Sequence, residues 1–302
     1  MIKPVPILTI SACLMLAGCG GGGGGGGGLT PVAFTSFAAV PKPGQVQLTG
    51  SSVEGDYASN SSFLVTSVTN QQTGSATVTS NYDAAGNQTA GTIAGSRSSV
   101  SFGPSDKAYN LSNIGLPGGR LMISSDGKTA TAFASPNDIG NNYQTYGVWE
   151  TGLNSGSGHF GAASVGAATS AGSVPTAGTA NFSGNAIGAY IDAGGGNYVT
   201  ASNATLAADF GARTVGFSTT NTQKYNANTY YSSSASNLNM SGSLSYAAGT
   251  NSFSGNVSTS GGMNGTASGR FYGPAATEIG GTFITKAATG VENFGGAFGA
   301  KR

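Results

Sequence analysis

The side chains that carry most enzyme chemistry are scarce in this chain. His159 is the single histidine among 302 residues, so a histidine-based metal cluster is excluded and only one imidazole is left for acid–base work. No Gly-x-Ser-x-Gly elbow between a strand and a helix supplies a nucleophile for it. We interpret His159 as a structural or surface residue. Haem ligation by His159 or by one of the 12 tyrosines is chemically open, but no spacing selects one. The sequence therefore indicates no catalytic residue, metal site or cofactor, and we expect the chain not to be an enzyme.

The two cysteines lie in an N-terminal segment that is typical of an export signal. Lys3 precedes an apolar run over residues 5–16, and this run ends at Leu16-Ala17-Gly18-Cys19. That ending resembles the bacterial lipobox, which implies removal of residues 1–18 and acylation of Cys19 with chains such as palmitate. Cys13 is removed with the signal peptide, so the mature chain would hold no free thiol. Gly20 stands where an aspartate would favour retention in the inner membrane, so the lipobox implies an outer-membrane lipoprotein.

A tether follows the expected lipid attachment site. Residues 20–28 are an unbroken glycine run, which behaves as flexible coil. The segment up to residue 44 contains three prolines and is stiffer. We predict that residues 19–44 form a lipidated, Gly/Pro-rich tether that holds the folded part away from the membrane surface.

Composition predicts an all-β protein. The chain has 52 glycines and only 8% charged residues, so Ser, Thr, Asn and Gly must cover the surface instead of the Lys and Glu that solubilise helices. Without Lys3 the chain has 11 basic and 11 acidic residues, which gives no electrostatic footprint for nucleic acid.

Period-two alternation of apolar and polar residues is strong in the second half. Leu244 and Tyr246 alternate with serines, and the alternation changes parity across Gly211, which indicates a tight turn or a bulge there. About eight strands are expected, the number whose barrel interior side chains can fill. A membrane-spanning barrel is disfavoured, because the face opposite the aromatic residues is polar and the chain ends in Lys301-Arg302. The expected strands span residues 179–191, 198–210, 214–220, part of 229–246, 251–258, 267–272, 280–285 and 293–300.

The first half is also predicted to be β-rich but less regular. Asp126-Gly127 is the best hairpin signal, and residues 83–87 offer a second, longer turn. Trp149, the lone tryptophan, is interpreted as a packing residue. The predicted organisation is a β-rich domain over residues 45–153, a Gly/Ala/Ser-rich linker over residues 154–176 and a soluble antiparallel barrel over residues 177–302.

The C-terminal end carries a family resemblance. The stretches Gly-Arg-Phe-Tyr-Gly-Pro, Glu-Ile-Gly-Gly-Thr-Phe and Phe-Gly-Ala-Lys-Arg resemble the closing strands of the lobe barrels of transferrin-binding protein B and related surface lipoproteins. The Gly-Pro pair must end one strand, because proline lacks an N–H group and cannot lie inside a paired central strand. The residues that carry the resemblance are Gly269, Phe271, Tyr272, Gly273, Pro274, Glu278, Gly280, Gly281, Phe283, Phe298 and Gly299.

This resemblance implies one lobe, in which a handle-like β domain precedes a barrel. It further implies a lipoprotein on the cell surface of a Gram-negative bacterium, anchored through acylated Cys19, that binds a host or environmental iron-carrying protein or haem. A TonB-dependent transporter is the implied membrane partner. A surface adhesin or coat lipoprotein without transported cargo remains the alternative.

The candidate ligand contacts lie in a Tyr- and Asn-rich segment over residues 221–231. Such composition suits protein recognition by loops at the open end of a rigid barrel. An ordinary strand, with one of its paired tyrosines in the core, is the alternative interpretation of this segment. The candidates are Lys224, Tyr225, Tyr230 and Tyr231.

Overall fold

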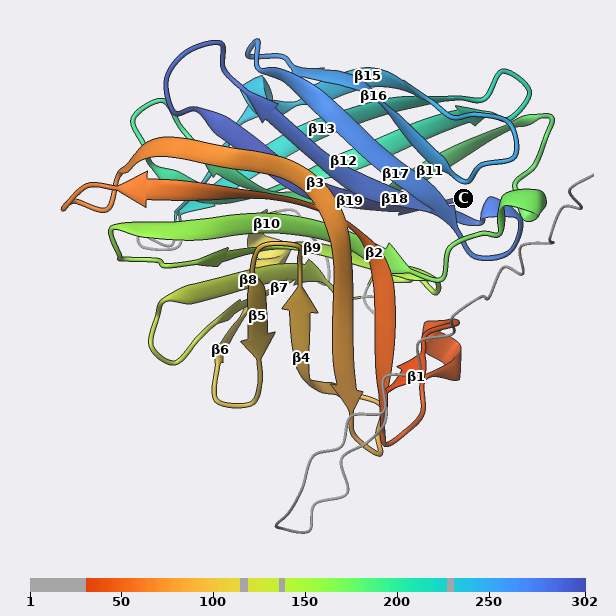
Figure 1. Ribbon diagram of the computed structural model, residues 1–302, viewed down its shortest axis with the longest axis horizontal. Coiled ribbons are helices and arrows are strands. Elements are labelled where there is room, and N and C mark those ends of the chain that lie inside the picture. The colour runs from red at the N-terminus through yellow and green to blue at the C-terminus, as the bar shows by residue number, and fades with distance from the viewer. Residues whose placement is uncertain (1–30, 115–118, 136–138, 227–230) are drawn as a thin grey trace, which may run out of the picture.

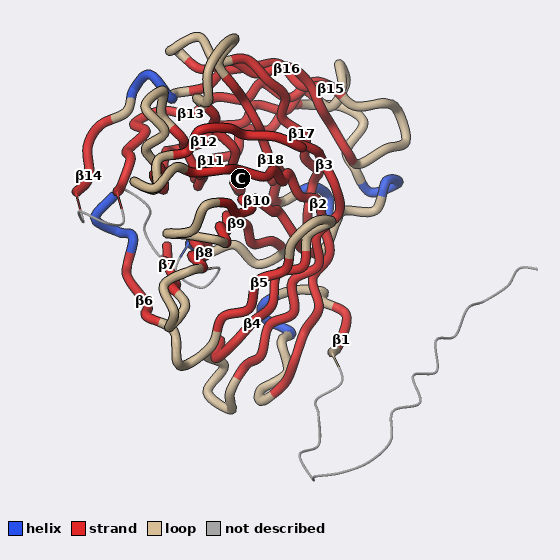
Figure 2. Tube along the Cα trace, turned by 60° about the vertical axis from the view of Figure 1, so that its left-hand side comes forward, coloured by secondary structure: helices blue, strands red, loops and turns tan. Residues whose placement is uncertain are grey.

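The computed structural model describes residues 31–114, 119–135, 139–226 and 231–302, which form two antiparallel β-sheets and short 3-10 helices (Figures 1 and 2). The expected lipid attachment site Cys19 and the candidate Tyr230 lie outside these residues. The all-β prediction is confirmed. In the described part of the chain, no helix has the length and apolar character needed to cross a membrane.

The first sheet has ten strands and is strongly curved. Its path runs β5-β4-β3-β2-β10-β9-β8-β7-β6, and β1 pairs in parallel with β2. The long strands β2 and β3 pass beneath the barrel and then bend away from it towards β4 and β5 (Figure 1). The strands are β1 (Val32–Ala33), β2 (Gly44–Ser59), β3 (Val65–Tyr82), β4 (Gln88–Ala94), β5 (Ser99–Phe102), β6 (Lys107–Asn110), β7 (Gly119–Ile123), β8 (Thr129–Ala134), β9 (Gln144–Thr151) and β10 (Ser157–Gly166).

The second sheet is a closed barrel of eight strands. Consecutive strands pair as antiparallel neighbours, and the ring closes through β11 with β19 and β12 with β13. A short strand, β14, extends from β13 outside the ring. The strands are β11 (Thr179–Ile191), β12 (Asn197–Asp209), β13 (Thr214–Asn226), β14 (Tyr231–Ser234), β15 (Met240–Ser245), β16 (Ser252–Thr259), β17 (Asn264–Tyr272), β18 (Glu278–Lys286) and β19 (Asn293–Lys301).

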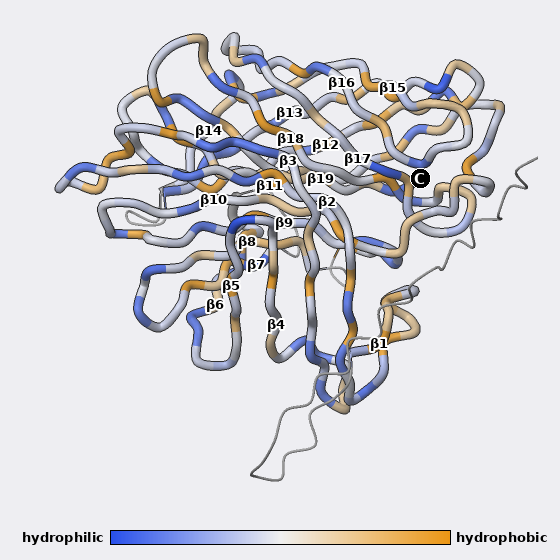
Figure 3. Tube along the Cα trace, viewed as in Figure 1, coloured by the Kyte–Doolittle hydropathy of each residue, from blue (hydrophilic) through white to orange (hydrophobic). Residues whose placement is uncertain are grey.

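The barrel interior is filled as the period-two pattern predicts. Met240 and Leu244 point inwards and are buried, whereas the serines between and beside them are exposed. The parity change at Gly211 is a turn between β12 and β13, in which Arg213 has a φ of 56°. Hydrophilic and hydrophobic residues both occur along the barrel strands (Figure 3). Large side chains from all sides of the ring share this core, among them Phe182, Phe217, Phe253, Phe271, Phe283, Phe294 and Phe298.

The two sheets pack on each other through strands β9 and β10. Every second residue of β9 faces the barrel, in the order Gln144, Tyr146, Val148 and Glu150. The apolar part of this interface joins Val53, Tyr146, Val148 and Ala162 of the first sheet to Ile187, Ala201 and Ala297 of the barrel. The intervening residues of β9 face the other way, into a second core around Trp149.

The turn predictions in the first half are confirmed. At Asp126-Gly127 a tight turn joins β7 to β8, with Gly127 at a φ of 69° donating its N–H to Ser124. Residues 83–87 join β3 to β4, and the Asp83 carboxylate accepts hydrogen bonds from the backbone of Ala85 and Asn87.

The expected linker over residues 154–176 is wrong in its middle part, because Ser157–Gly166 form the central strand β10. This strand pairs with β2 on one side and β9 on the other. Its Gly/Ala composition resembles a linker for a physical reason. Ala162 faces the barrel and Ala163 faces the opposite core, so both faces of the strand are covered, and small side chains fill its middle. Sequence patterning also missed the 16-residue strand β2, which is the other central strand of the sheet.

Candidate functional site

The C-terminal motif residues have two roles that alternate along each strand. Phe271, Phe283 and Phe298 point into the barrel and are fully buried. The residues between them point outwards, against β9 and β10 of the first sheet. Tyr272 shares a hydrogen bond of 3.0 Å with the Ser164 hydroxyl of β10. The motif is therefore both the barrel core and the surface on which the first domain docks.

Two motif glycines make this docking surface flat. Gly280 and Gly299 are direct partners across β18 and β19. A Cβ atom at Gly280 would collide with the side chains of Gln144 and Ser164, and one at Gly299 would collide with the ring of Tyr146. The Gln144 amide reaches the barrel backbone at this point, where its Nε2 lies 2.7 Å from the Ile279 carbonyl oxygen. Glycine is required at both positions because side chains of the first domain lie directly against the barrel backbone and leave no room for a Cβ atom.

Glu278 fastens the same end of the interface. Its Oε1 accepts a hydrogen bond of 2.6 Å from the backbone N–H of Asn142, and the N–H of Tyr143 lies 3.1 Å from Oε2. Burial raises the pKa of the Glu278 carboxyl, while these backbone N–H groups act in the opposite direction. Nearby, Gly273 has a φ of 73° and ends β17, so the Gly-Pro pair breaks the strand as expected. We call this region, around Glu278, Gly280 and Gly299, the closed end of the interface.

A cavity of about 450 Å³ lies at the other end of the interface, which we call the open end. Tyr57, Leu121 and Glu150 of the first sheet line it together with Asn197 and Tyr198 of the barrel. Three hairpin turns contribute to its lining: the β2–β3, β7–β8 and β9–β10 turns. The β11–β12 turn lies next to it, where the Gly195 carbonyl accepts a hydrogen bond from the Val65 N–H.

Glu150 is a buried carboxyl group in this cavity. Asn197 Nδ2 donates a hydrogen bond of 2.7 Å to Glu150 Oε1, and among the described residues the Oδ1 of Asn197 has no partner. Burial raises the pKa of Glu150 to about 7, although the Asn197 hydrogen bond acts against the shift. The neutral acid would be a hydrogen-bond donor, which the ionised group is not. The Glu150 charge and burial also raise the pKa of Tyr57.

The candidate contacts Lys224 and Tyr225 lie at the open end. The Lys224 ammonium sits 4.4 Å from the ring centre of Tyr198, a cation–π distance, and 5.9 Å from that of Tyr190. Tyr225 is half-buried against the interface core. Tyr231 begins β14 opposite Asn226, and its side chain is outside the described residues. Lys224 therefore lies beside the cavity through its contact with Tyr198, and Tyr225 is in part a packing residue.

An exposed apolar pair stands at the rim of this cavity. Phe63 and Leu64 are 52% and 42% exposed, which is rare for large hydrophobic side chains in the described part of this protein. The tight turn that holds them is fixed by Asn60, whose Oδ1 accepts hydrogen bonds from the N–H groups of Ser62 and Leu64. Phe63 has a φ of 60°, a strained backbone for a bulky residue. The hydrogen-bonded turn presents an aromatic ring to solvent.

Sequence reasoning did not select Phe63, Leu64, Glu150 or Asn197. The turn reaches residue 64, and β3 starts at Val65. The available signal was two large apolar residues directly after the turn-prone run Asn60-Ser61-Ser62. No comparable signal existed for Glu150, whose environment comes from a strand of the other domain.

His159 and Trp149 have the structural surroundings that were predicted. His159 Nδ1 lies 2.6 Å from Asp56 Oδ1, and Arg97 and Asn70 bind the other oxygen of that carboxylate. Burial acts to raise the pKa of Asp56, but these hydrogen bonds together lower it. Trp149 is 1% exposed, and its Nε1 donates to the Ser98 hydroxyl. Within the described ranges, no group of three or more His, Cys, Asp or Glu side chains could hold a metal ion.

Comparison with known proteins shows what the barrel is similar to. Residues 174–302 match the family model for the C-lobe and N-lobe beta barrels of Tf-binding protein B. No curated protein matches the chain.

Solved structures similar to the chain include transferrin-binding proteins B. A double mutant from Haemophilus parasuis Hp5 is 13% identical, with 87% of this chain and 78% of that one covered and a TM-score of 0.43. The protein from serogroup B Neisseria meningitidis is 12% identical, with 86% and 77% covered and a TM-score of 0.41. A surface lipoprotein is 10% identical, with 83% and 98% covered and a TM-score of 0.41. These scores and identities are low, so the relation to the lobe barrels of Tf-binding protein B depends on the family match, which covers residues 174–302.

Proposed function

We propose that this chain is a lipid-anchored outer-membrane lipoprotein of a Gram-negative cell surface that captures a protein ligand at the open end. The observation that carries the proposal is the exposed Phe63–Leu64 pair, held in a hydrogen-bonded turn at the rim of the cavity between the domains. Apolar anchors surrounded by polar residues dominate the binding energy of protein interfaces. A turn that is already ordered adds little entropy cost to binding.

The electrostatics of the open end suit a protein partner better than a charged small molecule. Lys224 is paired with the Tyr198 ring, and Tyr190 donates a hydrogen bond of 2.6 Å to Glu292. Tyrosine hydroxyl, amide and single charged groups around an aromatic anchor are typical of protein-recognition surfaces. By similarity to the transferrin-binding proteins, we infer that the ligand is an iron-carrying protein, passed on to a TonB-dependent transporter.

A binding experiment with matched variants tests the capture site. We would immobilise the mature chain and measure binding of transferrin and haemoglobin by surface plasmon resonance. The double variant Phe63→Ser with Leu64→Ser should weaken binding at least tenfold, on the order of a hot-spot loss. Val32→Ser is the control, because Val32 is equally exposed, at 54%, but lies in β1 of the first sheet, outside the open end.

The outcomes separate the candidate functions. Loss of binding in the double variant alone supports capture at the open end. Equal affinity of wild type and double variant for a bound iron protein would place capture elsewhere. Absence of binding to any iron-carrying protein, together with adhesion of intact cells to a surface, would favour the adhesin or coat function.

The anchor has its own test. Mass spectrometry of the mature N-terminus should find an acylated cysteine at position 19 and no residues before it. A Cys19→Ala variant should no longer fractionate with membranes. An unmodified Cys19 would overturn the lipoprotein part of the proposal and leave the capture site untouched.

A further inference from the structure

The curved first sheet encloses a second, larger cavity on the side away from the barrel. Its volume is about 560 Å³, within the range of about 300 to 1,000 Å³ that small-molecule sites occupy. The cavity exists because the sheet bends back towards itself without closing: the edge strand β5 approaches β8, and the rings of Phe102 and Phe133 stack with centres 5.3 Å apart. Strands β4 and β5 form one wall, and β7 and β8 form the other.

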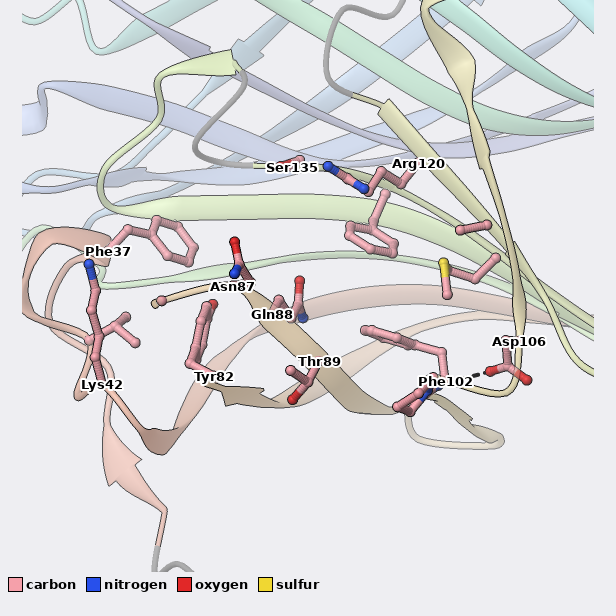
Figure 4. Close-up of a pocket in the computed structure, with 17 residues that line it drawn as sticks. Phe37, Lys42, Tyr82, Asn87, Gln88, Thr89, Phe102, Asp106, Arg120 and Ser135 are labelled. Carbon is pink, nitrogen blue, oxygen red and sulfur yellow. Dashed lines mark hydrogen bonds between the residues drawn. The ribbon is translucent and has the colours of Figure 1, made fainter. Parts of the chain in front are cut away.

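Aromatic side chains from distant parts of the chain converge on this space. Figure 4 shows the rings of Phe37, Tyr82 and Phe102 facing the cavity from three sides. Phe133 and Met122 complete the wall. At its inner end a small apolar recess, lined by Leu48, Val78, Ile93 and Val165, leads towards the core around Trp149. The rings and the recess offer contact surface to the apolar body of a ligand.

The polar groups of the cavity lie on several sides: Lys42 at one end, Arg120 and Asp106 towards the other, and Gln88 between them (Figure 4). Lys42 is exposed and makes no ion pair or hydrogen bond within the described part of the chain; its side chain lies over the Gly86 turn at the cavity edge. Thr89 and Asn87 lie at the same side (Figure 4). The acidic group of the lining, Asp106, lies at the opposite end from Lys42 (Figure 4), where its Oδ2 accepts a hydrogen bond of 2.9 Å from the backbone N–H of Gly103. A ligand head group thus meets a cation and hydrogen-bond donors.

We propose that this cavity binds a small amphipathic carboxylate, whose apolar chain or ring lies between Phe37, Tyr82 and Phe102 and whose carboxylate pairs with Lys42. The apolar end of the ligand points into the recess, and its negative head group lies beside Lys42. Neither the lipid anchor nor the protein ligand of the open end is required for this binding. The two sites lie on opposite faces of the first sheet, since the open-end cavity faces the barrel and this one faces away from it.

Displacement of a bound fluorescent probe from the full mature chain tests the proposal. The probe is 8-anilinonaphthalene-1-sulfonate, which has an aromatic body and one negative charge. We expect saturable binding of one probe molecule to the folded protein. Dodecanoate should displace it, whereas dodecylamine and dodecanol, of equal chain length, should displace it only at much higher concentrations.

Two variants locate the site. Lys42→Gln should weaken dodecanoate binding by about five-fold at low salt, because an exposed ion pair is lost. Its control is Lys286→Gln, an exposed lysine at the end of barrel strand β18. Ala108→Trp should abolish binding, because Ala108 is exposed on the edge strand β6 and its new ring would fill the cavity. Its control is Ala207→Trp, at an exposed position of barrel strand β12.

Thermal unfolding must first show that each variant is folded. The proposal is overturned if dodecylamine competes as well as dodecanoate, or if folded Ala108→Trp binds the probe like wild type. It is also overturned if binding does not saturate at one site. Transferrin or haemoglobin binding should be the same with the cavity filled or empty, so failure here leaves the capture site intact.

Discussion

The two ends of the interface between the domains differ, although a single strand, β9, faces the barrel along its whole length. At the closed end, Gln144 of β9 meets two facing glycines, and Glu278 accepts hydrogen bonds from two backbone N–H groups. At the open end, Glu150 of β9 has one amide donor beside a cavity of about 450 Å³. Both carboxyl groups are buried between the domains. Glu278 is held by backbone N–H groups, whereas Glu150 borders a cavity.

This difference separates scaffold from candidate function. Buried polar groups are normally satisfied by hydrogen bonds, and departures from this are concentrated at functional sites. The closed end follows the rule for its carboxylate and contains the family motif. Among the described residues, other buried side-chain atoms lack a partner at both ends, Asn197 Oδ1 at the open end and Gln144 Oε1, Asn141 Nδ2 and Tyr146 OH at the closed end. What distinguishes the open end is its cavity and its strained, exposed Phe63. We infer that the closed end fixes how the domains dock, so that the open end holds its turns in constant positions.

The largest expected effect comes from a side chain added at the closed end. Gly299→Val should lower the free energy of unfolding by about 4 kcal/mol, because the new side chain overlaps the Tyr146 ring in a packed interface. The control is Gly216→Val, on the outer face of β13, where an added Cβ meets no atom closer than 3.8 Å. That control should change stability by less than about 0.5 kcal/mol. Urea unfolding measures both, and equal effects would show that the docking surface tolerates rearrangement.

Removing the carboxylate of the closed end should have the next largest effect. Glu278→Ala leaves the buried N–H groups of Asn142 and Tyr143 without their acceptor, at a cost of about 3 kcal/mol. Glu278→Gln keeps one acceptor oxygen and should cost less than half as much. The comparison by urea unfolding isolates the hydrogen bonds from packing. If both variants lose the same stability, the negative charge matters and not the number of acceptors.

Much of the barrel could be predicted from the sequence, because its strands alternate buried and exposed faces. The expected strand over residues 179–191 coincides with β11, and the turn at Gly211 is where the parity change placed it. Strands β2 and β10 could not be found in this way. Both run through the middle of the sheet. Strand β10 and the second half of β2 are covered on two faces and show no polar alternation, and β10 uses alanine and glycine on both faces. Only the start of β2, residues 45–49, alternates polar and apolar side chains.

The candidate site was only partly visible in the sequence. Lys224 stands in a Tyr- and Asn-rich segment that indicated recognition, and it lies at the open end. Its position over Tyr198, however, comes from pairing between β12 and β13. The Glu150 environment depends on Asn197, which is 47 residues away in the other domain. Contacts between domains leave no local pattern, so a single sequence does not reveal them.

The pH dependence of stability should distinguish the two carboxyl groups. The pKa of Glu150 is raised from 4.5 to about 7 in the folded protein, so between these values the folded state binds a proton that the unfolded state has released. Stability therefore falls as pH rises from about 4.5 to 7. Glu150→Gln should remove up to about 3 kcal/mol of that fall and equal or exceed wild type at pH 8.

Thermal unfolding across pH 4 to 8 gives the measurement for this variant. In Glu150→Gln, stability should still fall as pH rises, although by less than in wild type, because burial also raises the pKa of Glu278. Parallel curves of stability against pH for wild type and Glu150→Gln would mean that Glu150 ionises in the folded protein without a cost in free energy. The cavity at the open end would then stabilise the Glu150 carboxylate as well as water does.

The smallest effect on stability belongs to the residue with the largest proposed effect on binding. Asparagine tolerates a φ near 60°, so Phe63→Asn relieves backbone strain and should leave stability unchanged or higher by up to about 1 kcal/mol. Leu64→Asn makes a similar apolar-to-polar change at the neighbouring exposed residue without positive φ, so it gains nothing from the backbone. Guanidinium unfolding compares the two. A loss of stability in Phe63→Asn beyond that of Leu64→Asn would show that the ring is held by packing against the cavity. A gain would mean that the protein maintains a strained, exposed phenylalanine at the expense of its own stability, as a preformed binding contact requires.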